Sequence, residues 1–132
     1  MMSKIPHAAV NKPNGAGFAR IFKATRCSFR GFNACWIHEA AFRQELLLVA
    51  GMFPFSFWIA QTPMQWLLLI MSLLFVIFAE LVNSALEALA DRITLEHDEL
   101  IGRAKDIGSA AVFIALSQVT LIWGTVLYLK LF

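Results

Sequence analysis

The chain has few charged residues and long stretches without any. Charged residues make up 15% of its 132 positions, and none lies between Glu45 and Glu80 or between Asp106 and Lys130. Hydrophobic residues make up 59%, against roughly 45–50% in soluble globular proteins. The mean hydropathy is +0.67. These values exclude an ordinary soluble domain and predict an all-α membrane protein whose surplus apolar surface faces lipid.

Cysteine is scarce, and a strong excess of charge of either sign is absent. Cys27 and Cys35 match no metal-binding spacing, and neither do the three histidines. We therefore expect two reduced thiols and no structural metal. The net charge of +2 is too small and too scattered for a nucleic-acid partner. It suits a basic fringe that meets anionic lipid headgroups.

The amino-terminal part of the chain divides into a tail and an amphipathic segment. Residues 1–16 contain no apolar run of a secretory signal, so we expect a flexible cytoplasmic tail there and one membrane domain over residues 17–132. Over residues 18–37, aromatic and aliphatic side chains share one side of a helical wheel. Arg20, Lys23, Arg26 and Arg30 share the other. This pattern predicts an amphipathic helix lying on the membrane surface.

Three apolar segments follow, and we predict transmembrane helices over about residues 44–62, 64–90 and 105–130. The first is the weakest, since its apolar run is short and contains Pro54. Tryptophan is enriched where membrane helices meet water. We therefore expect interface anchors at Trp36, Trp58, Trp66 and Trp123.

Lysine and arginine are unevenly distributed around these segments. Ten of the eleven lie before the first predicted span or between the second and the third. The positive-inside rule then places the amino terminus and the 92–105 connection in the cytoplasm. All nine acidic residues lie on the same side. We expect a multi-pass protein of the inner membrane whose chemistry faces the cytosol.

A hydrophilic stripe interrupts the end of the most apolar segment. At about 100° per residue, five polar side chains fall within an arc of roughly 100°. They are Glu80, Asn83, Ser84, Glu87 and Asp91. Such groups are costly near lipid unless they bind something or line a wet cleft. We interpret the stripe as the core of the functional site.

Two kinds of chemistry suit this stripe. Carboxylate and amide oxygens are the ligands of Mg²⁺, which commonly bridges carboxylates to nucleotide phosphates. Lys105 can neutralise phosphate charge, and Arg20 offers a forked donor near the surface. These residues fit phosphoryl transfer, although the chain has no phosphate-binding loop, dinucleotide fingerprint or protein-kinase signature. Intramembrane carboxylates suit an ion or proton pathway almost equally well.

Three ordered motifs connect the chain to a known family. They are Glu39–Glu45 (EAAFRQE), Glu80–Arg92 (ELVNSALEALADR) and His97–Val112 (HDELIGRAKDIGSAAV). In order and spacing they resemble the small integral-membrane diacylglycerol kinases of bacteria. The resemblance covers about Gly17 to the carboxyl terminus. It implies a homotrimer, with three transmembrane helices and a surface helix in each subunit, and active sites between subunits at the cytoplasmic interface.

The resemblance also implies a reaction and roles for individual residues. MgATP would transfer its γ-phosphoryl group directly to the primary hydroxyl of diacylglycerol, giving phosphatidic acid. Glu80 would be the general base, and Glu39 and Glu87 would hold Mg²⁺. The residues implied at ATP are Arg20, Asn83, Glu87, Lys105 and Asp106. The residues implied at the lipid alcohol are Arg20, Glu80 and Ser109, with Glu45 and Asp91 in support.

The chain departs from the family pattern at a few positions. His38 stands where the family often has Asn, Thr25 stands where Ala is common, and Cys27 stands where an aromatic residue is common. These changes affect the fine shape of the nucleotide or glycerol pocket and leave the carboxylates in place. Three alternatives stay open: an undecaprenol kinase of the same family, an oligomeric cation or proton channel, and a structural membrane adaptor.

Overall fold

The computed structural model describes residues 17–132, which fold entirely into α-helices and their connections. The predicted tail over residues 1–16 lies outside the described residues. Four helices follow one another along the described chain: α1 (Phe18–His38), α2 (Ala40–Ile59), α3 (Pro63–Ile93) and α4 (Glu99–Leu131). The chain forms two units, Met1–Asn33 and Ala34–Phe132, and each is described by itself.

The first unit contains most of α1, and the amphipathic pattern predicted for it is present. None of the residues of α1 is buried. Phe18 and Phe22 are 83% and 78% exposed. A helix that keeps its aromatic side chains exposed has apolar surface to offer to lipid. The helix ends at His38, so its last residues belong to the second unit.

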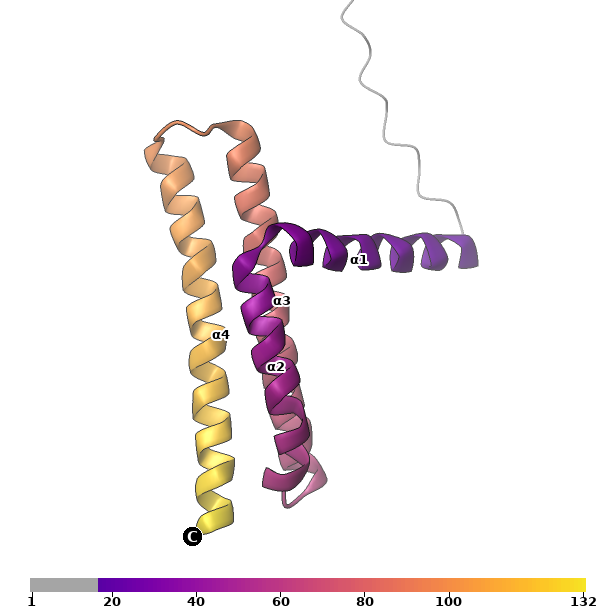
Figure 1. The fold of residues 1–132 in the computed structure, drawn as a ribbon, viewed down its shortest axis with the longest axis vertical. Coiled ribbons are helices and arrows are strands. Elements are labelled where there is room, and N and C mark those ends of the chain that lie inside the picture. The colour runs from indigo at the N-terminus through magenta and orange to yellow at the C-terminus, as the bar shows by residue number, and fades with distance from the viewer. Residues whose placement is uncertain (1–16) are drawn as a thin grey trace, which may run out of the picture. The chain divides into compact units, whose positions relative to one another are not determined.

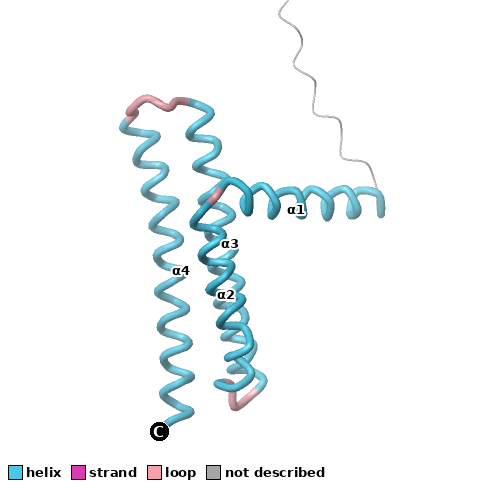
Figure 2. Tube along the Cα trace, in the orientation of Figure 1, coloured by secondary structure: helices cyan, strands magenta, loops and turns pink. Residues whose placement is uncertain are grey.

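The second unit is a bundle of α2, α3 and α4, which run side by side in Figure 1. Its centre is α3, which packs most extensively against α4 and also against α2. Figure 2 shows the two connections, from α2 to α3 and from α3 to α4, at opposite ends of the bundle. The antiparallel arrangement follows from the shortness of both connections.

Local capping determines where α3 and α4 begin. Thr62 accepts a hydrogen bond from the backbone N–H of Gln65 at 3.2 Å, and Pro63 occupies the first turn of α3. Asp98 caps α4 by accepting a hydrogen bond from the N–H of Ile101 at 2.9 Å. Because of this cap, α4 begins at Glu99, six residues before the start of the predicted span, and a polar first turn precedes its apolar part.

Two of the helices, α3 and α4, are long and apolar enough to cross a membrane by length and composition. The shorter α2 does not pass the same test. Its first turns carry Arg43, Gln44 and Glu45, so polar residues take up part of its length. The described chain is therefore all-helical, with two candidate membrane spans.

The core of the bundle lies mainly between α3 and α4, and α2 adds Ile59. Its buried members are Ile59, Leu69, Leu73, Val76, Ala79, Val112, Ala115, Val119, Trp123 and Val126. Trp123 was expected at the membrane interface, but it is only 8% exposed and donates its indole N–H to Ser72 Oγ at 3.2 Å. The prediction was wrong because a tryptophan whose N–H finds a partner can be buried, and Ser72 supplies that partner from the facing helix.

Trp123→Phe removes this interhelical hydrogen bond while keeping an aromatic ring in the core. We expect a loss of roughly 0.5–1.5 kcal/mol in the free energy of unfolding. Reversible unfolding in mixed micelles of detergent and sodium dodecyl sulfate measures it. The matched control is Trp36→Phe, since Trp36 is 44% exposed on α1. Equal stability of the two variants would show that the hydrogen bond contributes nothing.

A second contact joins α2 to α4 at the end of the bundle where α3 begins. The ammonium group of Lys130 donates to the backbone carbonyl of Trp58 and lies 4.2 Å from the centroid of its indole ring. The carbonyl belongs to the last turn of α2, where carbonyl groups lack helical partners. Lys130 therefore satisfies a free carbonyl and adds a cation–π contact.

Candidate functional site

The polar stripe of α3 is mostly buried in the structure. Glu80, Asn83 and Ser84 are 3%, 7% and 4% exposed. The next member, Glu87, is half-buried, and Asp91 is exposed. The stripe thus passes from the interior of the bundle toward the end at which α3 connects to α4. All five residues lie on α3, so their predicted placement on one face of a helix is confirmed, and their burial decreases from Glu80 to Asp91.

Carboxylates from two further parts of the chain surround Glu80. Glu87 lies one to two turns further along α3, Glu39 lies between α1 and α2, and Glu45 lies in α2. All three are close enough for their charges to act on the Glu80 carboxyl group. This cluster of Glu39, Glu45, Glu80 and Glu87 is the carboxylate cluster. Like charges gathered beside a buried carboxyl group are unfavourable unless protons or cations offset them.

Asn83 links the cluster to the interior of the bundle. Its Nδ2 donates a hydrogen bond to Glu87 Oε1 at 3.0 Å. A carboxylate can only accept, so this bond fixes which end of the amide faces Glu87. The arrangement holds one oxygen of Glu87 and leaves its other oxygen free to bind a ligand.

Several buried polar atoms around the cluster lack partners. Among residues 17–132, Asn83 Oδ1, Ser84 Oγ and Glu45 Oε2 are buried and accept or donate no hydrogen bond. Such atoms cost roughly 1–3 kcal/mol each. Natural proteins retain few of them, mainly where water, an ion or a functional role accounts for them. Their concentration around Glu80 therefore indicates a site rather than an ordinary packed core.

An ion pair joins α3 to α4 beside this cluster. Lys105 Nζ lies 3.0 Å from Asp91 Oδ1, and the two side chains are 38% and 56% exposed. A pair so exposed adds little stability, but it holds the ammonium group where the charges of Glu87 and Glu39 also act on it. The structure thus pairs Asp91 with a lysine on the neighbouring helix.

The same ion pair borders a small hollow of about 150 Å³. Its other walls come from the connection between α3 and α4 and the first turn of α4. They are Thr94, Leu95, Glu96, His97, Asp98, Ile101 and Gly102. A lysine at the edge of a hollow beside carboxylates is suited to hold an anionic ligand such as a phosphate.

Cys35, which the sequence predicted only to be a reduced thiol, lies close to the carboxylate cluster. Burial raises the pKa of the Cys35 thiol, the nearby Ser84 side chain lowers it, and the charges of Glu39 and Glu80 raise it again. The thiol is therefore uncharged at neutral pH and adds no negative charge to the cluster. Its closeness in sequence to Glu39 was the available signal, and in the structure the backbone N–H of Glu39 donates to the Cys35 carbonyl at 2.9 Å.

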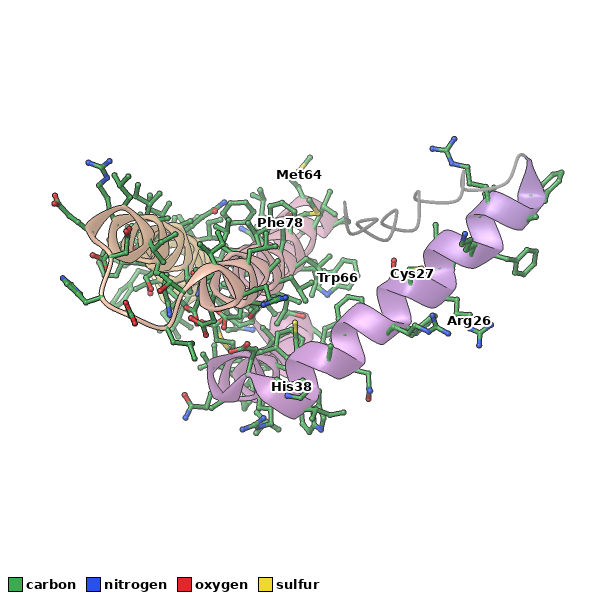
Figure 3. The ribbon with its side chains drawn as sticks, turned by 90° about the horizontal axis from the view of Figure 1, so that it is seen from above. Arg26, Cys27, His38, Met64, Trp66 and Phe78 are labelled. Carbon is green, nitrogen blue, oxygen red and sulfur yellow. The ribbon has the colours of Figure 1, made fainter. Side chains whose placement is uncertain are left out.

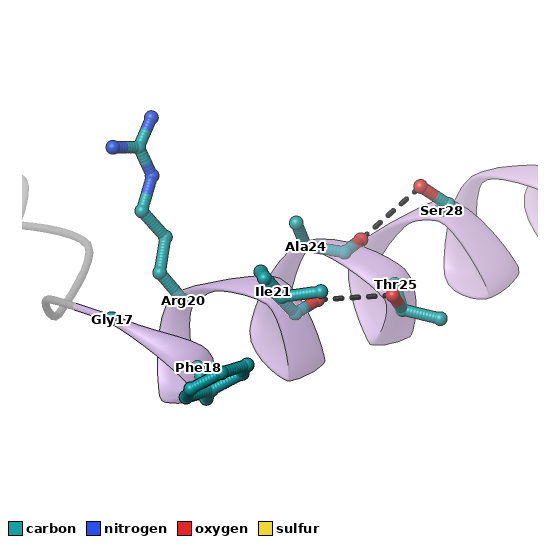
Figure 4. Close-up of a pocket in the computed structure, with 7 residues that line it drawn as sticks. All are labelled: Gly17, Phe18, Arg20, Ile21, Ala24, Thr25 and Ser28. Atoms are coloured by element: carbon teal, nitrogen blue, oxygen red, sulfur yellow. Dashed lines mark hydrogen bonds between the residues drawn. The ribbon is translucent and has the colours of Figure 1, made fainter.

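Three predicted site residues lie apart from these contacts. Asp106 and Ser109 are exposed on α4, and within the described chain no hydrogen bond or ion pair joins them to the carboxylate cluster. Arg20 belongs to the first unit. Figure 4 shows it at a shallow hollow on α1 that is also lined by Gly17, Phe18, Ile21, Ala24, Thr25 and Ser28.

The departures from the family pattern fall at exposed positions. Thr25 donates its hydroxyl to the Ile21 carbonyl at 2.9 Å, as Figure 4 shows. Cys27 and His38 are exposed as well. Figure 3 labels Cys27 along α1 and His38 at the end of that helix. None of the three belongs to the carboxylate cluster.

A metal ion held by protein side chains alone does not fit this site. Throughout residues 17–132, no group of three or more His, Cys, Asp and Glu side chains is arranged to hold one. Mg²⁺ commonly takes one or two protein carboxylates and completes its shell with waters and substrate phosphates. The half-buried pair Glu39 and Glu87 offers ligands of that number and kind.

Comparisons with known proteins agree on one family. The family model described as prokaryotic diacylglycerol kinase matches residues 26–127. The chain is 45% identical over 115 residues to the diacylglycerol kinase of Escherichia coli strain K12, covering 87% of this chain and 94% of that protein. It is 42% identical over 112 residues to the diacylglycerol kinase of Haemophilus influenzae, and the match covers 85% of this chain and 95% of that protein. It is 43% identical over 111 residues to the diacylglycerol kinase of Pseudomonas aeruginosa, and the match covers 84% of this chain and 90% of that protein.

Proposed function

The chain belongs to the prokaryotic diacylglycerol kinase family, and from this premise we propose how its residues carry out the reaction. It is a membrane protein and an ATP-dependent lipid kinase that phosphorylates diacylglycerol. The observation that carries the mechanism is the carboxylate cluster around the buried Glu80. This cluster lies toward the polar end of a long apolar helix. Diacylglycerol can therefore reach the cluster from the bilayer, and ATP can reach it from the cytosol.

Glu80 is the general base. Its carboxylate takes the proton from the primary hydroxyl of diacylglycerol as the hydroxyl oxygen attacks the γ-phosphorus of ATP. The new oxygen–phosphorus bond forms in line with the bond that breaks, and ADP leaves as phosphatidic acid is formed. Burial of Glu80 supports this role, because a carboxylate shielded from water can keep its lone pair for the substrate proton.

Glu39 and Glu87 would hold Mg²⁺ when it binds with ATP. The bound ion would neutralise negative charge on the phosphates during transfer. The hydrogen bond from Asn83 orients the Glu87 carboxylate for this purpose. A bound cation would also offset the repulsion among the four carboxylates of the cluster, which would let them lie together near the membrane.

Lys105, positioned by Asp91, binds the nucleotide phosphates at the edge of the hollow between α3 and α4. Asp106 contributes to the nucleotide site from α4. Ser109 contributes to the lipid-alcohol site from the same helix, and Arg20 serves both substrates. Glu45 supports the site from α2. The exposure of Asp106 and Ser109 within one chain is consistent with a site that a neighbouring subunit completes.

The protein is a homotrimer of the bacterial inner membrane, with α2 as a third span beside α3 and α4. Polar residues at the start of α2 lie level with the carboxylate cluster, so Glu45 can face the site while the rest of the helix meets lipid. The distribution of Lys and Arg supports a cytoplasmic amino terminus and a cytoplasmic site. Polar surfaces near lipid are better enclosed by several subunits than by one.

A transfer assay tests the proposed function. Purified protein in mixed micelles receives radiolabelled ATP and Mg²⁺ with either diacylglycerol or undecaprenol. We expect labelled phosphatidic acid that depends on Mg²⁺, and little product from undecaprenol. Product from undecaprenol alone would contradict diacylglycerol as the substrate and would leave the phosphoryl-transfer mechanism in place. No product from either lipid, with ion flux across liposomes in the absence of ATP, would favour a channel.

A further inference from the structure

Gly108 in α4 lies closely against Asn83 of α3. Gly108 is buried, and a Cβ atom at this position would stand 2.4 Å from Asn83 Oδ1, 3.4 Å from Asn83 Cγ and 3.5 Å from Leu86 Cδ1. Comfortable contacts between heavy atoms begin at about 3.5 Å. The α4 backbone therefore approaches the Asn83 amide so closely that any side chain at position 108 would force the amide to move.

The Asn83 amide is held from two sides as a result. Nδ2 donates to Glu87 Oε1 at 3.0 Å. At the other end, Oδ1 is buried against Gly108 and has no hydrogen-bond partner among the described residues. A flipped amide would turn its oxygen toward the Glu87 carboxylate, where two acceptors would repel. The observed orientation is thus the one that Gly108 and Glu87 together allow.

We infer that Gly108 is a positioning residue, whose missing side chain lets α4 hold Asn83 so that Asn83 orients Glu87 toward the metal ion. The inference rests on the proposed role of Glu87 in binding Mg²⁺. Gly108 itself touches neither metal nor substrate in this account. Its effect passes through one hydrogen bond on the neighbouring helix.

The packing around Gly108 indicates that a methyl group there would disturb the site more than the fold. The atom it would meet at 2.4 Å is the end of a single side chain rather than backbone. Buried residues such as Val76, Ala115 and Val119 hold α3 against α4 further along the bundle. An apolar groove of about 180 Å³ adjoins Asn83 and Gly108. The amide therefore has room to rotate while the helices stay together, and rotation breaks its bond to Glu87.

The test compares Gly108→Ala with Gly124→Ala in the full-length protein. Gly124 lies in the same helix, and a Cβ atom there would meet nothing within 4 Å in residues 17–132. The probe is Mn²⁺, titrated in the presence of a non-hydrolysable ATP analogue and followed by the loss of the free-ion electron paramagnetic resonance signal. We expect Gly108→Ala to bind Mn²⁺ about tenfold more weakly or worse, and Gly124→Ala to match the wild type.

A double variant separates positioning from general packing. If Gly108 acts through Asn83, then Asn83→Ala with Gly108→Ala binds Mn²⁺ as weakly as Asn83→Ala alone. Additive losses, or wild-type Mn²⁺ affinity in Gly108→Ala, would overturn the inference while the proposed function stands. A wild-type protein that binds no Mn²⁺ with the ATP analogue, yet phosphorylates diacylglycerol, would refute both the metal role of Glu87 and the inference.

Discussion

Glu80→Gln is expected to lower kcat for phosphatidic acid formation by about 10²–10⁴-fold, the usual contribution of a general base. The amide has nearly the shape of the carboxylate but cannot accept the substrate proton. Glu80 is 3% exposed, so water has poor access to replace it as the base. The KM for MgATP should change little, because the proposed metal and nucleotide ligands are other residues. Initial rates in mixed micelles, at varied ATP and diacylglycerol, measure both constants.

The fold should survive this change. A buried carboxylate surrounded by Glu45, Glu87 and Glu39 carries unfavourable repulsion, and a neutral amide removes it. We therefore expect Glu80→Gln to unfold at the same or a higher denaturant concentration than the wild type. Glu99→Gln is the matched control, since Glu99 is an exposed carboxylate in the first turn of α4. A kcat for Glu80→Gln within a few fold of that control would contradict its role as the base.

The helices themselves could be predicted from the sequence because each depends on a local pattern. Apolar length predicted α3 and α4, and the aromatic and basic faces predicted α1. The start of α4 was predicted less accurately than its end, for a physical reason. Apolarity marks where lipid can lie, whereas a helix begins at its cap, and the cap of α4 is Asp98, seven residues before the predicted span. Asp98 is a typical capping residue, but the length of an apolar segment says nothing about where its cap lies.

The site residues that lie on one helix could be predicted from the sequence, whereas the contacts between helices could not. Spacing on α3 placed Glu80, Asn83 and Glu87 on one face, and the hydrogen bond from Asn83 to Glu87 agrees with it. Contacts between helices depend on rotation and translation that no single helix encodes. The pairing of Lys105 with Asp91 and the approach of Gly108 to Asn83 are contacts of this kind.

Trp123 illustrates the same limit in the core. The preference of tryptophan for the membrane interface is an average over many proteins. Whether one tryptophan follows it depends on whether its N–H has a buried acceptor, and Ser72 lies 51 residues away in the sequence. A prediction from composition treats all four tryptophans alike, whereas packing distinguishes Trp123, at 8% exposed, from Trp58, at 60%.

Glu87→Gln is expected to reduce the rate at low millimolar Mg²⁺ by about a hundredfold or more, since the charge stabilisation from a metal ion amounts to several kcal/mol. Glutamine keeps an oxygen that can accept the 3.0 Å hydrogen bond from Asn83, so this substitution removes the charge and leaves the local packing intact. Raising Mg²⁺ should restore part of the activity, because the phosphates and Glu39 still bind the ion. Rates measured across a range of Mg²⁺ concentrations test this.

Asn83→Ala separates the effect of the Glu87 charge from the effect of its orientation. It leaves the Glu87 charge in place and removes only the hydrogen bond that orients it, so we expect a smaller rise in the Mg²⁺ requirement, about tenfold. If the charge of Glu87 matters more than its orientation, Glu87→Gln has the lower rate of the two variants at low Mg²⁺. The difference between their rates then becomes smaller as the Mg²⁺ concentration rises. If both variants keep the wild-type Mg²⁺ dependence, Glu87 binds no metal. The carboxylate cluster would then have to be stabilised by shared protons instead of a cation.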